Sequence, residues 1–155
     1  MKLLHFSDLH IGVENYGRPD PETGFSTRLL DFLKTFDEMI NYAIESDVDV
    51  VLFAGDAYKN RDPSQTHQRE FARRITRLAN QNIPIYLVTG NHDLPNIAGR
   101  ASAIEIFPTL EVERVFISDH ISTTIIPTKS GPLQILGVPW IRRSQFLTRD
   151  DTRDL

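Results

Sequence analysis

The middle of the chain reads Asp49-Val50-Val51-Leu52-Phe53-Ala54-Gly55-Asp56. Its first five residues form a continuous run rich in β-branched side chains, which is typical of a strand buried on both faces. Comparable short apolar runs occupy Lys2–Phe6 and Ile85–Val88. Amphipathic helical patterns separate the three runs, so the element order is β-α-β-α-β. This order predicts an α/β fold with a parallel sheet and right-handed crossovers.

Apolar residues at helical spacing mark the two connecting helices. Ser26 can cap the first helix, which ends near Ser46, and Pro63-Ser64 opens the second, which Asn80-Gln81-Asn82 ends. The segment Gly12–Gly24 before the first helix is a loop, and its length suggests a functional one. The expected buried positions are Leu29, Leu33, Phe36, Ile40 and Ala43 in the first helix, and Phe71, Ile75 and Leu78 in the second.

The predicted elements become shorter after Pro95. A short helix is expected around Ala101–Phe107, and three short strands follow it. Because tight polar turns join these strands, they predict antiparallel structure. We expect one domain over residues 1–143, and either a polar tail or the start of a missing segment over residues 144–155. The three strands are Arg114–Ile117, Ile121–Ile126 and Leu133–Val138.

Composition narrows the class of protein. The 155 residues suffice for one domain with a sizeable core, and 17 Lys and Arg against 21 Asp and Glu give a net charge of −4. A general nucleic-acid clamp is usually strongly basic, so bound metals or a local basic patch would have to attract a polyanion. The absence of cysteine excludes disulfides and thiolate metal sites. Without a signal peptide or a membrane-length apolar run, a soluble cytoplasmic protein is expected.

Polar side chains follow each of the three predicted parallel strands. Asp8 and His10 follow the first, Asp56 follows the second, and Asn91-His92-Asp93 follow the third. Ligands bind at this edge of a parallel sheet, and neighbouring strands lie ~4.8 Å apart, so these side chains can converge. Carboxylate, imidazole and amide oxygen together suit Mn²⁺, Fe or Zn²⁺.

These residue types suggest two-metal hydrolysis. Asp56 holds the central position, from which one carboxylate can bridge two cations. Two such metals can clamp a phosphoryl oxygen and generate a hydroxide near neutral pH. His92 can donate a proton to the leaving alkoxide, and Asp93 can fix its tautomer. Lys59-Asn60-Arg61 follow the Asp56 loop, where contact with a substrate phosphate and plain solvation are equally supported.

Ordinary structural explanations compete with each signal. Gly-Asp after a strand is usually a turn, and Gly-Asn-His-Asp can be a turn with Asn in the left-handed region. All three segments at successive strand ends nevertheless favour a metal site. The other histidines are expected to be structural, His5 in a strand, His67 exposed on a helix and His120 in a turn. A further stripe is expected to be a solvated helix face, and it consists of Arg69, Arg73 and Arg77.

The three segments together resemble the calcineurin-like metallophosphoesterases. The pattern of that family is Asp-x-His, then Gly-Asp, then Gly-Asn-His-Asp or Gly-Asn-His-Glu. A narrower resemblance, to SbcD-type DNA repair exonucleases, rests on four longer segments. These are Leu4–Gly12, Gly55–Ser64, Gly90–Pro95 and Leu136–Trp140.

The resemblance implies a fold and an activity. The fold is an α/β/β/α sandwich of two sheets, and the activity is phosphodiester cleavage of DNA with two divalent ions, chiefly Mn²⁺, although Mg²⁺, Fe or Zn²⁺ is also compatible. It further implies a coiled-coil ATPase partner of the SbcC type. A homodimer through helices matching residues 64–80 and 101–107 is implied as well.

The resemblance also assigns roles to individual residues. Asp8, His10 and Asp56 match the ligands of one metal, Asp56 and Asn91 match those of the other, and His92 matches the catalytic histidine, with Asp93 beside it. Family members carry one further histidine and then a Gly-His-x-His motif, whereas no histidine follows His120 here. The expectation is therefore an N-terminal portion of a nuclease, with reduced or no activity by itself.

Two alternatives stay open at this point. The same scaffold and metal site serve phosphomonoesterases and cyclic-nucleotide phosphodiesterases. The missing histidines alternatively suggest a non-catalytic dimerisation or scaffold module.

Overall fold

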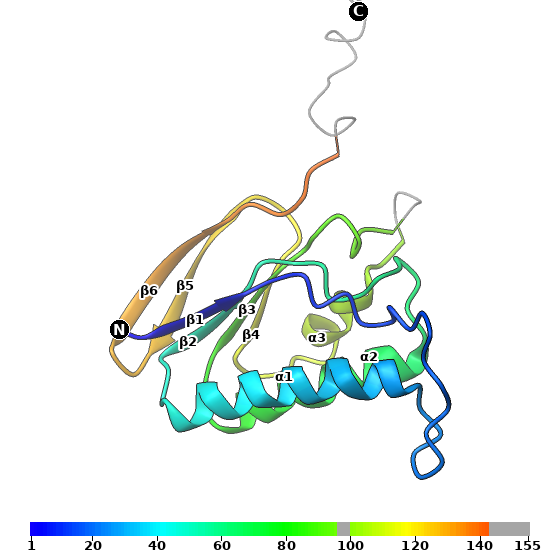
Figure 1. Ribbon diagram of the computed structural model, residues 1–155. Helices are drawn as coiled ribbons and strands as arrows, with labels where there is room; N and C mark the ends of the chain where they lie inside the picture. Colours follow the sequence, from blue (N-terminus) through cyan, green and yellow to red (C-terminus); the bar gives the residue numbers. More distant parts are fainter. Residues whose placement is uncertain (96–99, 143–155) are drawn as a thin grey trace, which may run out of the picture.

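The computed structural model of the chain describes residues 1–95 and 100–142 (Figure 1). The boundary expected at residues 143–144 and the polar tail lie outside the described residues. In chain order the elements are β1 Leu3–Phe6, α1 Thr27–Glu45, β2 Val50–Phe53, α2 Gln65–Asn80, β3 Ile85–Val88, η1 Ala103–Glu105, α3 Ile106–Thr109, β4 Val115–Ser118, β5 Ser122–Thr128 and β6 Gly131–Gly137.

The main sheet has the strand order β1-β2-β3-β4, and all its neighbouring strands are parallel. The predicted parallel α/β core is therefore confirmed. The prediction of antiparallel pairing was wrong for the strand around residues 114–117, because β4 pairs in parallel with β3. The chain between them passes through η1 and α3, and this length of crossover lets β4 run in the same direction as β3.

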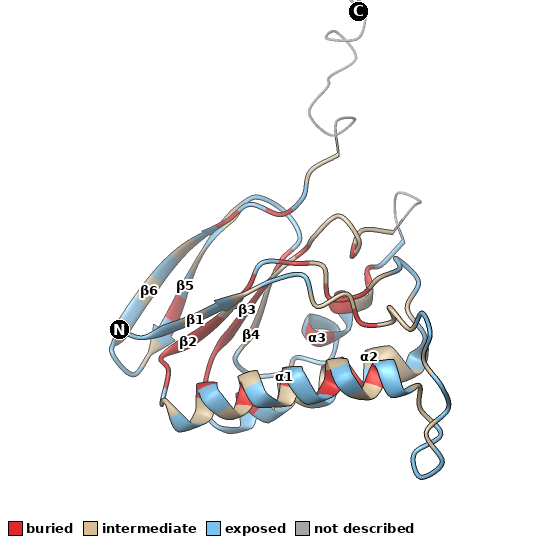
Figure 2. Cartoon of the chain, in the orientation of Figure 1, coloured by how far each residue is buried: buried red, intermediate tan, exposed pale blue. Residues whose placement is uncertain are grey.

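Two serines begin the long helices as the sequence predicts. The Ser26 hydroxyl accepts a hydrogen bond from the Arg28 backbone N–H at the start of α1, and Ser64 does the same for His67 at the start of α2. Both helices lie along one face of the sheet, with their buried sides turned toward it (Figures 1 and 2). All eight predicted positions are buried, namely Leu29, Leu33, Phe36, Ile40, Ala43, Phe71, Ile75 and Leu78.

An aromatic cluster fixes α2 beneath the sheet. Phe71 has no exposed surface, and its ring centroid lies 5.8 Å from that of Phe36 and 5.9 Å from that of Phe53. It also contacts Tyr58, at 5.4 Å, and Phe107, at 6.1 Å. One side chain thus joins both long helices, β2, the segment after β2 and α3.

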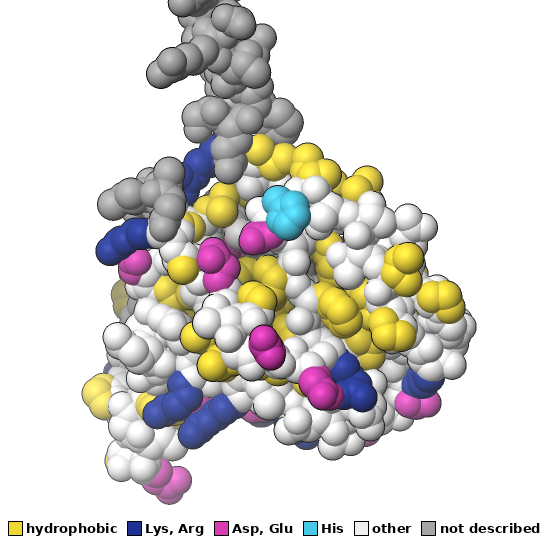
Figure 3. Space-filling view, turned by 180° about the vertical axis from the view of Figure 1, so that it is seen from behind, with side chains coloured by type: hydrophobic (Ala, Val, Ile, Leu, Met, Phe, Trp, Pro, Cys, Tyr) yellow, Lys and Arg dark blue, Asp and Glu magenta, His cyan; other side chains and the backbone are white. Residues whose placement is uncertain are grey.

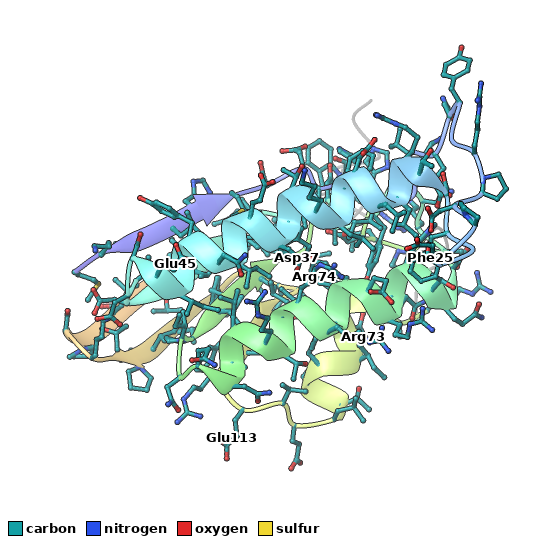
Figure 4. All side chains as sticks on the ribbon, turned by 60° about the horizontal axis from the view of Figure 1, so that its bottom comes forward. Phe25, Asp37, Glu45, Arg73, Arg74 and Glu113 are labelled. Atoms are coloured by element: carbon teal, nitrogen blue, oxygen red, sulfur yellow. The ribbon has the colours of Figure 1, made fainter. Side chains whose placement is uncertain are left out.

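A charged network also joins the two helices. Arg74 of α2 lies 2.6 Å from Asp37 of α1 and 3.1 Å from Glu70 one turn earlier, and Figure 4 shows Asp37 and Arg74 facing each other. Burial by itself raises the pKa of Glu70, but hydrogen bonds from Arg69 and Arg74 and the charge of Arg73 outweigh it, so the pKa lies below its usual value. The stripe Arg69, Arg73 and Arg77 is exposed, as predicted, although Glu70 neutralises part of its charge.

The β5–β6 hairpin is antiparallel, as predicted, and contacts the main sheet. Gly137 packs so closely against Tyr86 and Ser118 that a Cβ there would overlap both side chains. Lys129 in the turn of the hairpin pairs with Asp47 before β2. Together with the helices, the two sheets supply three of the four expected layers within residues 1–95 and 100–142.

Three strands leave apolar surface exposed. β1 is an edge strand of the described sheet, and it is half-buried rather than buried, with Leu3 and His5 exposed. On β5 and β6, the exposed large side chains are Ile125 and Leu136. Hydrophobic side chains are gathered in patches on the face shown in Figure 3.

Candidate metal centre

The loops after β1, β2 and β3 meet at one edge of the sheet. The Asp8 backbone N–H donates to the Gly55 carbonyl at 3.0 Å, and that of His10 donates to the Asp56 carbonyl at 3.0 Å. Beyond these residues the pairing resumes as a parallel bridge between Ile11 and Tyr58. The first two candidate loops are therefore laid side by side by their own backbones.

Three candidate ligands have unusual backbone geometry. Asp8, His10 and Asp56 have φ angles of 59°, 45° and 62°, in the left-handed region. Asp and His enter this region more readily than most residues, but each still costs about 1 kcal/mol or more. Strained residues persist where the surrounding structure holds them, and they cluster at functional sites.

The side chains of these residues converge. His10 Nε2 lies 3.4 Å from Asp8 Oδ1 and 3.8 Å from Asp56 Oδ2. His10, Asp56 and His92 each offer one ligand atom, and these three atoms all lie within 4.8 Å of one another. The Asp8 carboxylate is 64% exposed. Its pKa is lowered, chiefly because the Ser7 hydroxyl donates a hydrogen bond to it.

Asn91 joins this group through a shared cavity of about 240 Å³. Asp8, Asp56 and Asn91 line the cavity, and so do Val138 and Trp140. The Trp140 backbone N–H donates to the Thr89 carbonyl at 2.9 Å, which holds the segment after β6 against the end of β3. The sequence interpretation did not place these last two residues at the site. The available signals were their position at the end of the predicted last strand and the resemblance of the segment Leu136–Trp140.

His92 is held at two points. Its backbone N–H donates to Asp56 Oδ1 at 2.9 Å, and its ring Nδ1 lies 2.7 Å from the Lys59 carbonyl oxygen. A carbonyl can only accept, so Nδ1 carries a proton and Nε2 is left for a metal or a substrate oxygen. The ring stands edge-on to that of His10, with centroids 4.9 Å apart.

Asp93 does not make the contact that was expected of it. The sequence interpretation had its carboxylate fix the His92 tautomer, but the Lys59 carbonyl does so. The Asp93 carboxylate is buried and accepts the backbone N–H groups of Asp56, Ala57 and Gly90 at 2.8, 3.0 and 2.9 Å. Burial nevertheless raises the pKa of Asp93. Asp93 therefore ties the loop after β2 to the loop after β3.

Glycines at positions 55 and 90 permit the close approach of these loops. A Cβ on Gly55 would lie 2.7 Å from the Gly90 Cα, and Gly55 also has a φ of +100°. A Cβ on Gly90 would overlap the Asp56 carboxylate. The Gly-Asp and Gly-Asn-His-Asp motifs thus need glycine for space at the point where they touch.

The expected substrate residues lie beside His92. Lys59, Asn60, Arg61 and His92 line one shallow cavity, of about 530 Å³. Arg61 also donates from Nε to the Asn91 carbonyl at 3.3 Å. The structure thus brings these side chains to the candidate site, and their contact with a phosphate stays a prediction.

The remaining histidines lie apart from the cluster. His67 was predicted to be exposed, but its side chain is only 17% exposed and lies 2.6 Å from Glu14. Glu14 lies in the loop before α1. The helical pattern of α2 cannot predict a partner in that loop. His120 pairs with neighbouring Asp119 on the surface.

The donor set fits a divalent metal centre. Carboxylates from Asp8 and Asp56, the His10 imidazole and the Asn91 amide oxygen are hard or intermediate donors of the kind that Mn²⁺, Fe and Zn²⁺ accept. The strained ligand backbones and the shared cavity fit the same interpretation. The three motifs therefore form one candidate metal centre at the carboxyl edge of the parallel sheet.

The calcineurin-like phosphoesterase family matches residues 1–153, and the chain belongs to this family. Among curated relatives, the DNA double-strand break repair protein Mre11 of Thermoplasma acidophilum is 35% identical over 100 residues, which is 64% of this chain and 25% of the relative. Mre11 of Archaeoglobus fulgidus is 36% identical over 93 residues, or 60% of this chain and 19% of the relative. Mre11 of Sulfurisphaera tokodaii is 28% identical over 137 residues, or 88% and 32%.

These comparisons confirm both levels of the sequence resemblance, since Mre11 is the counterpart of SbcD. The matched part of the chain spans between 19% and 32% of the length of these three relatives. None of the helices within residues 1–95 and 100–142 has the length and apolar character that crossing a bilayer requires.

Proposed function

We propose that the protein is a metal-dependent phosphodiesterase that cleaves DNA, with a role in double-strand break repair. The observation that carries this proposal is the convergence of His10, Asp56 and His92 within 4.8 Å at the carboxyl edge of the sheet. The Mre11 relatives, which are DNA double-strand break repair proteins, supply the substrate class.

We assign the ligands as follows. Asp8, His10 and Asp56 would hold one divalent ion, Asp56 and Asn91 would contribute to a second, and Mn²⁺ is the ion we expect. Such ions, when bound, polarise a phosphoryl oxygen and lower the pKa of a bound water. The exposed Asp8 and half-buried His10 face the open side of the site, whereas Asp56 is only 13% exposed and occupies its centre.

His92 acts as the proton donor. In its doubly protonated form, Nδ1–H stays on the Lys59 carbonyl while Nε2–H delivers its proton to the leaving oxygen. The hydrogen bond from its backbone to Asp56 keeps the ring at a fixed distance from the metal ligands. Lys59, Asn60 and Arg61 contact the substrate phosphates from the neighbouring cavity.

The proposal extends to a homodimer and a partner subunit. Ile106, which lies within residues 101–107 and is 44% exposed, supports a homodimer through the helices matching residues 64–80 and 101–107. An SbcC-type coiled-coil ATPase subunit and a cytoplasmic location complete the proposal, on the strength of the resemblance.

Digestion of linear duplex DNA by the purified full-length protein tests the activity, since reduced or no activity is expected of this chain by itself. We expect cleavage with Mn²⁺, none with EDTA, and none by the Asp56→Asn variant, which serves as the control for contaminating nucleases. The same samples are offered a phosphomonoester and a cyclic nucleotide. Hydrolysis of either with DNA left intact would assign the protein to the alternative phosphatase or cyclic phosphodiesterase class. A folded dimer that binds no metal and cleaves none of these substrates would instead assign it to the scaffold class.

A further inference from the structure

The first turn of α2 contacts the loop that follows the ligands of β1. The His67 ring Nε2 lies 2.6 Å from Glu14 Oε1, although the two residues are 53 positions apart in the chain. The side chains are 17% and 31% exposed, so water competes only in part for this hydrogen bond. An ionised carboxylate only accepts, and His67 Nε2–H is therefore the donor.

The same ring packs against the backbone of the loop. Gly12 has a φ of +106°, and a Cβ there would lie 3.0 Å from the His67 Cε1 atom. A larger residue would have to displace the imidazole. The ring therefore contacts both ends of the Gly12–Glu14 segment, one end by packing and the other by a hydrogen bond.

This segment continues directly from His10. The Val13 backbone N–H donates to the His10 carbonyl at 3.3 Å, and the Ile11 backbone N–H donates to Ala57 at 3.0 Å. On one side of His10, the Asp8 backbone is held by Gly55. On the other side of His10, the segment after Ile11 contacts α2 through His67.

We propose that His67 is a positioning residue for the metal ligand His10, and that it acts through the Gly12–Glu14 segment. His10 has a backbone φ of 45°, a conformation that persists only where the neighbouring chain is restrained. The hydrogen bond to Glu14 and the packing on Gly12 add restraint from α2 to that of the backbone pairing with Asp56 and Ala57. The inference rests on the proposed function, because it takes His10 to be a ligand.

Two single variants and their combination test this role. In metal-free protein, we expect His67→Ala and Glu14→Ala each to speed amide hydrogen exchange over residues 12–14. Each should also raise the dissociation constant for Mn²⁺ alone, followed by the electron paramagnetic resonance signal of free Mn²⁺, by about tenfold, the low end for partners of ligand residues. The double variant should lose no more affinity than His67→Ala alone, because Glu14 acts through its contact with the His67 ring.

Matched variants separate positioning from general stability. Thr66→Ala alters the adjacent residue of the same helical turn and should leave exchange and affinity unchanged. His67→Gln keeps an N–H donor at the position of Nε2 and should restore most of the affinity. If His67→Ala fails to fold, Glu14→Ala and His67→Gln carry the comparison, because Glu14 lies in a surface loop.

The outcomes distinguish the inference from the proposed function. Unaltered protein that binds no Mn²⁺ contradicts the proposed function, and the positioning role falls with it. Unaltered protein that binds Mn²⁺ with the same affinity as Glu14→Ala and His67→Ala contradicts the positioning role alone. Additive losses in the double variant also overturn it, since independent effects exclude a shared contact.

Discussion

The backbone N–H of His92 donates to Oδ1 of Asp56 at 2.9 Å, so the proposed proton donor is tied directly to the proposed bridging ligand. The other carboxylate oxygen, Oδ2, lies 3.8 Å from His10 Nε2. The Asp56 carboxylate therefore sets the separation between His10, a proposed metal ligand, and His92, the proposed proton donor. Ligand and proton donor cannot shift independently while this bond persists.

Replacing His92 by Ala separates its two possible roles. Since the backbone bond to Asp56 does not need the ring, we expect Mn²⁺ binding to be kept. The rate should fall by ~10²–10⁴-fold, the usual contribution of a positioned general acid. Single-turnover hydrolysis and Mn²⁺ titration measure the two quantities, with His120→Ala, a surface histidine, as the control. Loss of Mn²⁺ would show that His92 is a ligand, as its grouping with His10 and Asp56 also allows.

Gly90→Ala should impair the metal centre without a change in any ligand. The added methyl group would overlap the Asp56 carboxylate, so that side chain must move. We expect Mn²⁺ affinity to fall by about tenfold or more, as when a ligand loses its orientation. Gly24→Ala is the control, because a Cβ there meets nothing within 4 Å and only the backbone is strained. Equal affinities in the two variants would refute the role given to the close approach.

The network around Glu70 should give stability a pH dependence. The pKa of Glu70 is lowered in the folded protein, so its contribution is present above the unfolded pKa and is lost as the pH falls through the folded value. Glu70→Gln should therefore cost about 2 kcal/mol at pH 7, in the range for hydrogen bonds to charged groups. This difference should shrink as the pH falls below the usual carboxyl range and should be lost below the lowered pKa of Glu70.

Denaturant unfolding across that pH range measures the effect. Glu38→Gln, an exposed change on α1, should show no comparable difference at either end. A constant loss at every pH would mean that the packing of Glu70, rather than its charge, stabilises the contact between α1 and α2.

Lys59→Ala should weaken DNA binding through a single phosphate contact. Because each neutralised phosphate releases counterions, the slope of log affinity against log salt should become shallower by about 1. Binding is measured with duplex DNA in the absence of turnover, over a range of salt concentrations. Lys34→Ala removes the same charge from the exposed side of α1 and should leave the slope unchanged. Identical slopes for the two variants would place Lys59 outside the DNA path.

The parallel core was predictable because its signals are local. The continuous apolar run Val50–Phe53 and the helical spacing of apolar residues from Leu29 to Ala43 each predict buried positions from the local sequence. The direction of β4 was not predictable in this way, since a short apolar run such as Val115–Ser118 suits either direction and only the crossover decides its orientation. The partner of Asp93 was missed for a related reason. Its carboxylate binds three backbone N–H groups, and backbone partners leave no mark on sequence.

The bridge between Ile11 and Tyr58 makes the ligand segments an interruption inside a ladder, not its frayed end. Frayed strand ends open at little free-energy cost, whereas a segment paired on both sides opens only together with its neighbours. Tyr58 is itself buried against Phe71, so opening the bridge would disturb the aromatic core. We therefore expect opening of the Asp8–Ile11 and Gly55–Tyr58 segments to be coupled to opening of the core, and their hydrogen-bonded amides to exchange slowly with solvent.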